Sequence, residues 1–281
     1  MVYKCYCYSK INLYLDVVEK REDGFHNIIS LFQCISLHDS IYLELMDGNP
    51  KDVIFKSNDV SLKWNEKNSI FRAFKEFQSV FGSLDKGMRI FVKKRIPKAC
   101  GLGGESSDAA GMLLLLAKLK EVEVKEILEL AENVGSDVKF FLIGGTALVR
   151  GRGELIKKLN SLKNWSVDLR IPPFYFKTPE MYKLIDENAE RIVHKGNALE
   201  LYSALKNKDI EKIKQNLFNV FEQVAILNQS DIVAYKDSDF SCMTGSGPAF
   251  YILRENKIGR YVFVEGGNKI EEINKEISGL W

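Results

Sequence analysis

The stretch KRIPKACGLGGESSDAA, residues 94–110, has the composition of an anion-binding loop. Its three glycines permit backbone conformations that side chains forbid, and the serines after them stand at the start of an apolar helix. Exposed amide N–H groups and the dipole of a helix N-terminus bind anions such as phosphate. Ser106 and Ser107 could serve phosphate oxygens or a magnesium ion. The alternative is a tight turn before a well-capped helix, which the glycines alone leave open.

This loop differs from the two best-known phosphate loops. A dinucleotide-binding fingerprint would need a third glycine where Ser106 stands. A Walker loop would need Gly-Lys-Ser or Gly-Lys-Thr, which the sequence lacks. The loop is therefore a nucleotide-site candidate of another kind.

Two further polar segments could act on a phosphoryl group. Residues 10–17, KINLYLDV, alternate as in a β-strand, so Lys10 and Asn12 share the face that points away from the core. Asp137 follows a predicted helix that ends at Gly135. A kinase for a small hydroxyl substrate needs a nucleotide cradle, a cation and a carboxylate that accepts the hydroxyl proton. The alternatives are a solvated strand face for Lys10 and Asn12, and a helix N-cap for Asp137.

Composition argues against nucleic-acid-binding, membrane-spanning and secreted proteins. The 281 residues are 46% hydrophobic and 28% charged with a net charge of +2, as in an ordinary globular protein. The sequence has no run of basic residues with interleaved aromatic residues, so it gives no support for nucleic-acid binding. The longest apolar run, 109–117, is far shorter than the ~20 residues of a membrane span, and the N-terminus lacks a signal-peptide pattern. Five cysteines without a framework predict reduced thiols, and hence a cytoplasmic protein.

Histidine usage argues against two other chemistries. Three histidines occur, at positions 26, 38 and 194, and none has the spacing of a metal site or a catalytic triad. Zinc chemistry and serine–histidine hydrolysis therefore have no support.

Hydrophobic periodicity predicts an α+β protein of two domains, 1–154 and 155–281. The pattern restarts near residue 155, and the segment from residue 269 onward is expected to complete the second domain. The predicted strands are 10–17, 41–45, 88–96, 146–150, 167–171, 260–264 and two within 240–253 that flank a small-residue loop. The predicted helices are 69–81, 109–119, 127–134, 178–192, 197–206 and 210–226.

The sequence resembles the GHMP small-molecule kinases along almost its whole length. Their glycine motif is matched by Pro97–Ser107. More discriminating are the Lys-Ile-Asn of residues 10–12 and the Asp-Gly-Phe-His of residues 23–26, which are most similar to members that act on CDP-methylerythritol. Further matching segments are 31–33, 135–138, 140–141, 151–154, Asn219 with Glu222, and 245–247.

The resemblance implies a fold and an activity. Its members place the active site between an N-terminal ribosomal-protein-S5-like domain and a C-terminal ferredoxin-like domain. The implied reaction is ATP-dependent phosphorylation of the 2-hydroxyl of CDP-methylerythritol, in the non-mevalonate route to isoprenoid precursors. The implied partners are these two small molecules, with neither nucleic acid nor membrane, and a homodimer is left open.

The resemblance also implies residue roles. Asp137 would take the hydroxyl proton, with Lys10 beside it to keep the carboxylate ionised and offset phosphoryl charge. Asn12 would hold the substrate. The cytosine would stack between Phe25 and Tyr182, while His26 would read the base edge, partly through its backbone.

ATP would lie along the glycine loop, with Mg²⁺ between its phosphates and a loop serine, for which Ser107 is the candidate. The loop 245–247 would close over the site from the other domain. The nucleotide-binding residues implied are Asn68, Pro97, Lys98, Ala99, Cys100, Gly101, Leu102, Gly103, Gly104, Glu105, Ser106 and Ser107.

Three positions depart from the pattern of similar sequences. Ala99 and Glu105 stand where glycine is usual, and Lys139 replaces a common proline. Ala99 is expected to adopt an ordinary α or β conformation. Glu105 should repel ATP by ~1 kcal/mol or more unless it points outward or meets the magnesium. Two alternatives stay open: a GHMP kinase for mevalonate, homoserine or a sugar, and a catalytically silent nucleotide sensor, to which Glu105 is the only pointer.

Overall fold

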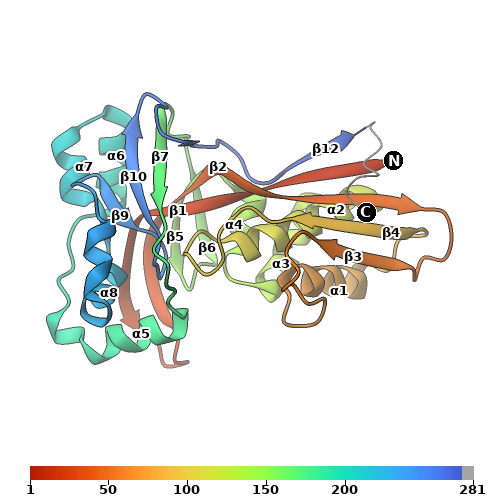
Figure 1. Cartoon of the computed structure of the whole chain (residues 1–281), viewed down its shortest axis with the longest axis horizontal. Coiled ribbons are helices and arrows are strands. Elements are labelled where there is room, and N and C mark those ends of the chain that lie inside the picture. The colour runs from red at the N-terminus through yellow and green to blue at the C-terminus, as the bar shows by residue number, and fades with distance from the viewer. Residues whose placement is uncertain (274–281) are drawn as a thin grey trace.

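Two long strands form the spine of the molecule. The computed structural model describes residues 1–273, in which β1 (Val2–Lys20) and β2 (His26–Met46) pair antiparallel from Val2↔Glu44 to Lys20↔His26. Figure 1 shows this hairpin crossing an elongated molecule from the lobe with the chain's N-terminus to the opposite lobe. The strand predicted over 10–17 lies inside β1. The hairpin therefore carries Lys10 and Asn12 to the junction between the lobes.

The first lobe is a sheet covered by helices on one face (Figure 1). The sheet has eight strands, with the main order β12-β1-β2-β4-β3. Its other strands in this lobe are β3 (Val53–Ser57), β4 (Gly87–Lys93), β5 (Thr146–Gly151), β6 (Leu155–Leu159) and β12 (Lys269–Ile273). The helices are α1 (Ser69–Phe81), α2 (Gly104–Lys120), α3 (Val124–Val134) and α4 (Val138–Ile143).

Helix α2 packs directly on β1. A Cβ atom at Gly111 would lie 2.4 Å from Cys7 Sγ, so only glycine permits this approach. Cys5 and Cys7 are buried free thiols in this core, as their shared strand face predicts. The close contact fixes the start of α2, and with it the glycine loop, relative to β1.

The second lobe holds a four-stranded sheet, β11-β7-β10-β9. Its hydrophobic core also includes the second half of β1, through Ile11, Leu13 and Leu15. The strands are β7 (Trp165–Arg170), β9 (Ser241–Met243), β10 (Phe250–Glu255) and β11 (Tyr261–Val262). The helices are α5 (Thr178–Glu187), α6 (Ala198–Asn207), α7 (Ile210–Asn216) and α8 (Val220–Asn228), with 3₁₀ turns at Ala189–Arg191 and Ser230–Tyr235.

Several predicted elements differ in their bounds. The helix predicted over 210–226 is broken into α7 and α8 by β8 (Phe218–Asn219), which pairs in parallel with β1. The helix predicted to residue 192 ends at Glu187. Helix α2 begins at Gly104 rather than near residue 109, so the loop serines lie within its first turn. The helix predicted over 69–81 is confirmed as α1.

The two sheets do not divide at residue 154. Strand β6 pairs with β5, and β12 pairs with β1, so both join the first sheet although they follow that position. The expectation that the chain from residue 269 onward completes the second lobe is therefore wrong for residues 269–273, and 274–281 lie outside the described residues. The domain boundary itself stays a prediction. No helix within residues 1–273 is long and apolar enough to cross a membrane.

Candidate active site

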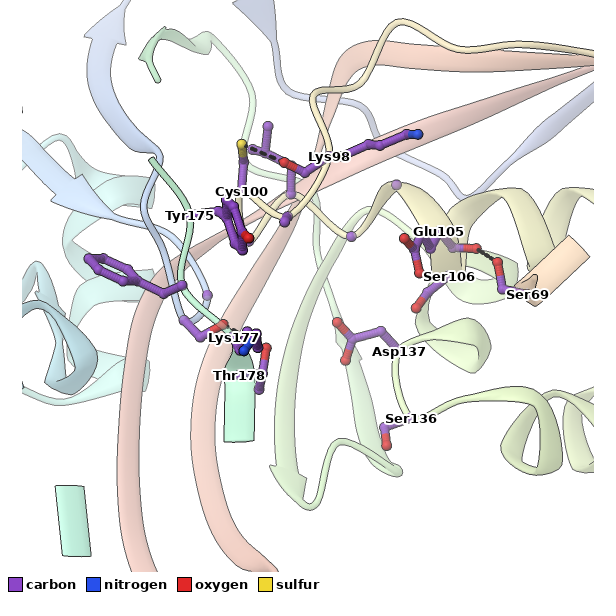
Figure 2. Close-up of a pocket in the computed structure, with 18 of the residues that line it drawn as sticks. Ser69, Lys98, Cys100, Glu105, Ser106, Ser136, Asp137, Tyr175, Lys177 and Thr178 are labelled. Atoms are coloured by element: carbon purple, nitrogen blue, oxygen red, sulfur yellow. Dashed lines mark hydrogen bonds between the residues drawn. The ribbon is translucent and has the colours of Figure 1, made fainter. Parts of the chain in front are cut away.

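A cavity of about 1210 Å³ lies between the two lobes. Both the glycine loop and the Phe25–His26 corner line it, so the two pockets expected from the sequence are parts of one space. Figure 2 shows Asp137 directed into this space. Around it lie Glu105 and Ser106 on one side, and Tyr175, Lys177 and Thr178 on the other.

Lys10 is held beside Asp137 inside the cavity. Its Nζ donates to Asn12 Oδ1 at 2.7 Å, lies 3.5 Å from Asp137 Oδ2 and sits 4.3 Å from the centroid of the Phe32 ring. Burial lowers the pKa of Lys10, and the neighbouring Asp137 carboxylate opposes that shift. The pair thus combines a cation and a carboxylate at the centre of the site.

Lys10 and Asn12 share the face of β1 opposite the core residues Ile11 and Leu13, as predicted. That face, however, is not exposed to solvent. Lys10 is 4% exposed and Asn12 is 1% exposed. The reason is that Gly103, Phe32 and Asp137 enclose Lys10, while Thr244 and Gly245 of the second lobe hydrogen-bond Asn12. The alternative of a solvated strand face is therefore wrong.

Asp137 stands at the N-cap position of α4, yet its side chain makes no capping hydrogen bond. Its side chain is 28% exposed within the cavity and faces Lys10. The N-cap alternative therefore lacks the hydrogen bond that would define it. A Cβ atom at Gly153, in the turn after β5, would lie 3.5 Å from Ser136 Cβ and 3.6 Å from Asp137 Oδ1, and the φ of 121° there favours glycine.

Asn12 ties Lys10 to the second lobe. Its Oδ1 accepts from Lys10 Nζ, from Thr244 Oγ1 at 3.3 Å and from the Gly245 amide at 2.9 Å. Its Nδ2 donates to Ser30 Oγ at 2.9 Å. Most of its hydrogen-bonding capacity is thus used within the protein. Its predicted role in holding substrate stays untested, and its observed role is to orient Lys10.

The glycine loop has the backbone that an anion site needs. Gly103 is the N-cap of α2 with φ 72°, and the Lys10 amide donates to Leu102 O at 3.0 Å. Gly101 has φ 75°, and a Cβ there would lie 2.0 Å from Thr244 O. Ala99 has φ 51°, so the expectation of an ordinary conformation is wrong. The loop is bent into the left-handed region at three positions and presents the start of α2 to the cavity.

The two loop serines lie differently. Ser107 does not line the cavity, because its buried hydroxyl donates to Asn268 Oδ1 at 3.1 Å. Ser106 and Glu105 do line the cavity. Ser107, the residue named as candidate metal ligand, is therefore turned away from the space that a nucleotide would fill. Glu105 is exposed, and its backbone oxygen accepts from Ser69 Oγ at 2.8 Å (Figure 2).

Two buried carboxylates support the base of the loop. Asp39 accepts from the backbone amides of Arg95 and Ile96, and Lys94 Nζ contacts both Asp39 and Asp108. Burial raises the pKa of Asp108 to about 7, with Lys94 opposing that shift. The cluster fixes the strand end from which the loop departs.

The remaining predicted nucleotide residues surround the loop. The Lys98 side chain leads away from Asp137 (Figure 2) and pairs with Asp59, so its charge is already balanced. Asn68 caps α1 through Oδ1, while its buried Nδ2 has no hydrogen-bond partner among the described residues. The predicted residues that line the cavity are Asn68, Pro97, Lys98, Ala99, Cys100, Gly101, Leu102, Gly103, Gly104, Glu105 and Ser106.

The part of the cavity expected to hold the cytosine is built from the β1–β2 turn and α5. Phe25 is 54% exposed, and the Arg152 guanidinium lies 4.7 Å from its ring centroid. The buried His26 ring stacks on Tyr182, with centroids 4.7 Å apart and an interplanar angle of 19°. The ring that faces Tyr182 here is thus His26. Stacking of a base between Phe25 and Tyr182 stays a prediction.

Sequence reasoning missed several cavity residues. Arg152 carried only a turn signal, and Tyr175 and Lys177 had none, because they lie in a loop before α5. Helix α5 has Lys177 at its N-cap, so Thr178 is its first helical residue and does not cap the helix. The Thr178 hydroxyl instead hydrogen-bonds Ser246 Oγ at 2.8 Å, joining α5 to the loop at 245–247.

Asn219 and Glu222, noted as motif residues without a role, hold that loop. Asn219 Nδ2 donates to Met243 O at 2.7 Å and Gly245 O at 2.9 Å. Glu222 Oε2 accepts from the Met243 amide at 3.1 Å. The start of α8 thereby fixes Thr244 and Gly245, which in turn contact Asn12.

The oxygen donors in the cavity fit a magnesium ion. Glu105 and Ser106 supply hard oxygen atoms, which Mg²⁺ prefers. Within residues 1–273 no cluster of three or more His, Cys, Asp or Glu side chains could hold a metal by itself. Such a site suits an ion that uses one or two protein oxygens together with nucleotide phosphates.

Comparison with known proteins identifies the family. Residues 68–145 match the GHMP kinases N terminal domain. A 4-diphosphocytidyl-2-C-methyl-D-erythritol kinase of Thermotoga petrophila is 41% identical over 265 residues, which cover 92% of this chain and 94% of the relative. A crystal structure of 4-(cytidine 5'-diphospho)-2C-methyl-D-erythritol kinase matches with a TM-score of 0.74 and 30% identity over 88% of each chain.

The fold is shared more widely. The homoserine kinase of Cytophaga hutchinsonii matches with a TM-score of 0.66 at 18% identity, over 96% of this chain and 97% of the other. That similarity shows only that the fold is shared, whereas the relative at 41% identity establishes the family of this chain. The chain belongs to the GHMP kinases, in the group of the 4-diphosphocytidyl-2-C-methyl-D-erythritol kinases.

Proposed function

We propose that the protein transfers the γ-phosphoryl group of ATP to the 2-hydroxyl of CDP-methylerythritol, a step of isoprenoid precursor synthesis. The observation that carries the proposal is the position of the Lys10–Asp137 pair. It lies in one cavity with the glycine loop and with the Phe25–His26 pocket. A donor nucleotide and a cytidine acceptor could therefore meet at this pair from opposite sides.

Asp137 is placed to act as the general base. As the substrate oxygen attacks the γ-phosphorus, its O–H proton passes to the Asp137 carboxylate, a new O–P bond forms and the bond to the ADP oxygen breaks. Lys10 would place its ammonium group next to Asp137 and next to the moving phosphoryl group. Asn12 and the Thr244 loop hold Lys10 in position.

The nucleotide would bind along the start of α2. The amide groups of the first turn, with the helix dipole behind them, would take up the phosphates. The partnerless Nδ2 of Asn68 offers a donor for a ring nitrogen of the adenine. Ser106 and Glu105, rather than Ser107, are the residues that would hold Mg²⁺, which offsets phosphate charge when bound.

The acceptor would bind at the hairpin corner. The exposed Phe25 ring offers a stacking surface for the base, worth ~1–3 kcal/mol. The Arg152 guanidinium lies over Phe25 and also lines the cavity. Its charge would complement the diphosphate that links the cytidine to the methylerythritol.

The direct test measures ADP release from MgATP by the purified protein. CDP-methylerythritol is the acceptor, with mevalonate, homoserine and galactose as controls. Release with the cytidyl substrate alone is the expected result. Release with one of the other acceptors would keep the kinase site and discard the cytidine pocket. ATP binding without release for any acceptor would favour a silent nucleotide sensor.

A further inference from the structure

Asp186 joins the base pocket to the second lobe, although no motif singled it out. It lies one turn after Tyr182 on α5, so both side chains face the same way. Its carboxylate lies 2.8 Å from His26 Nε2 and 2.7 Å from Lys20 Nζ. Lys20 and His26 are paired across the end of the β1–β2 hairpin. One carboxylate of α5 thus contacts both strands of the corner that carries Phe25.

The Asp186 carboxylate is ionised near neutral pH. Partial burial raises its pKa, but hydrogen bonds from Lys20 and His26 outweigh burial and leave the pKa below its usual value. An ionised carboxylate only accepts hydrogen bonds, so His26 Nε2 must carry a proton. In a neutral imidazole the other nitrogen, Nδ1, is then an acceptor with a free lone pair.

The rest of the pocket holds the ring in this orientation. His26 is buried and stacks on Tyr182. Among the described residues no hydrogen bond is made by His26 Nδ1, and His26 lines the cavity. The pocket therefore presents one fixed acceptor nitrogen beside the exposed Phe25 ring.

We propose that Asp186 is a positioning residue for base recognition, because it fixes His26 in the Nε2–H tautomer. Nδ1 then accepts a hydrogen bond from the 4-amino group of cytosine. Uracil carries a carbonyl at that position, so two acceptors would face each other and the pocket rejects it. The inference rests on the proposed function, since it assumes that a cytidine substrate occupies this pocket.

The substitution Asp186→Asn tests the role in specificity. An asparagine amide can donate or accept, so it no longer dictates the His26 tautomer. Loss of this control should raise KM for CDP-methylerythritol about 10- to 100-fold. The preference for CDP-methylerythritol over its uridine analogue should fall by a similar factor, whereas kcat and KM for ATP should stay within about twofold.

The matched control is Glu187→Gln, the next residue on α5. It makes the same change of charge, but Glu187 pairs with Lys183 at 3.4 Å and not with His26. This variant should keep the wild-type base preference. If Asp186→Asn also keeps it while the wild type phosphorylates CDP-methylerythritol, the inference is overturned and the proposed function stands. If the wild type does not use CDP-methylerythritol, both fail.

A spectroscopic readout tests the tautomer without any substrate. The ¹⁵N chemical shifts of the His26 imidazole distinguish a protonated from an unprotonated nitrogen. The unliganded wild type should show protonated Nε2 and unprotonated Nδ1, and Asp186→Asn should shift this pattern toward a mixture. Protonated Nδ1 with unprotonated Nε2 in the wild type would overturn the inference whatever the substrate.

Discussion

Ala99 occupies a left-handed backbone conformation in the glycine loop, with φ 51°. A Cβ atom in that region costs about 1–2 kcal/mol, because it crowds the following carbonyl oxygen. Glycine removes this crowding, although part of the gain is offset by the larger entropy of its unfolded chain. The loop therefore carries strain at the point where it enters the cavity.

Substitution Ala99→Gly should raise the free energy of unfolding by about 0.5–1 kcal/mol. Denaturant titration of both proteins measures the change. The contrasting control is Ala117→Gly within α2, which should lower stability by about 1 kcal/mol or more. A decrease in stability for Ala99→Gly would show that the loop does not strain this residue.

Residue types predicted the cation and the base but not their surroundings. Lys10 and Asp137 could be singled out from chemistry and position, and the structure brings them within 3.5 Å. The orientation of Ser106 and Ser107 could not be predicted, because consecutive residues in a helical turn point about 100° apart and the register depends on the helix start. Asp186 was missed because a carboxylate on an amphipathic helix carries no local signal.

At the scale of elements, the cluster of Asp39, Lys94 and Asp108 connects the end of β4 to the start of α2. Lys94 has a raised pKa, because its two carboxylate neighbours outweigh burial. Asp108 is buried at the same ammonium group, and its Oδ1 has no hydrogen-bond partner among the described residues. Burial of this carboxylate is the reason that its pKa rises to about 7.

This raised pKa predicts a dependence of stability on pH. Between the unfolded value of 3.8 and the folded value of about 7, the native state binds more protons than the unfolded state. The contribution of Asp108 is therefore complete below pH 3.8 and is lost as the pH rises through about 7. The loss should be on the order of 1–2 kcal/mol between pH 5 and 8, allowing for coupling to Lys94.

The variant Asp108→Asn isolates this contribution. Urea unfolding at several pH values should show that wild-type stability, relative to the variant, declines from pH 5 to 8. A difference that stays constant across this range, or that grows with pH, would contradict the assigned pKa direction. Helicity by circular dichroism checks that the variant keeps its fold.

Elements with a clear periodicity of hydrophobic residues could be predicted from the sequence. Elements that depend on pairing between distant segments could not. The phenylalanine stripe of residues 69–81 indicates a helix by itself, and α1 has those bounds. The break between α7 and α8 arises because Phe218 and Asn219 pair with β1, more than 200 residues earlier in the chain. Such pairing overrides a helical period that is otherwise continuous from residue 210 to 226.

At the scale of the molecule, the site depends on contact between the lobes. Thr244 and Gly245 hydrogen-bond Asn12, and Gly101 packs against Thr244. Asn219 hydrogen-bonds the backbone of this loop at Met243. The contact between the lobes buries Asn12, and Gly103, Phe32 and Asp137 of the first lobe enclose the neighbouring Lys10. One strand read alone shows an amphipathic pattern, and residues of both lobes turn its polar face into the wall of a cavity.

The central claim is that this cavity is a kinase site in which Asp137 removes the hydroxyl proton. The variant Asp137→Asn keeps the shape of the side chain and removes its basicity. It should bind MgATP with near wild-type affinity and phosphorylate CDP-methylerythritol about 10²–10⁴ times more slowly. Asp231→Asn, at an exposed carboxylate in the 3₁₀ turn Ser230–Tyr235, should behave as the wild type.

Single-turnover phosphorylation with saturating MgATP is the most direct measurement of this claim. The account predicts a slow chemical step in Asp137→Asn with unchanged nucleotide affinity. A near-normal rate in that variant would remove Asp137 from the mechanism and contradict the account.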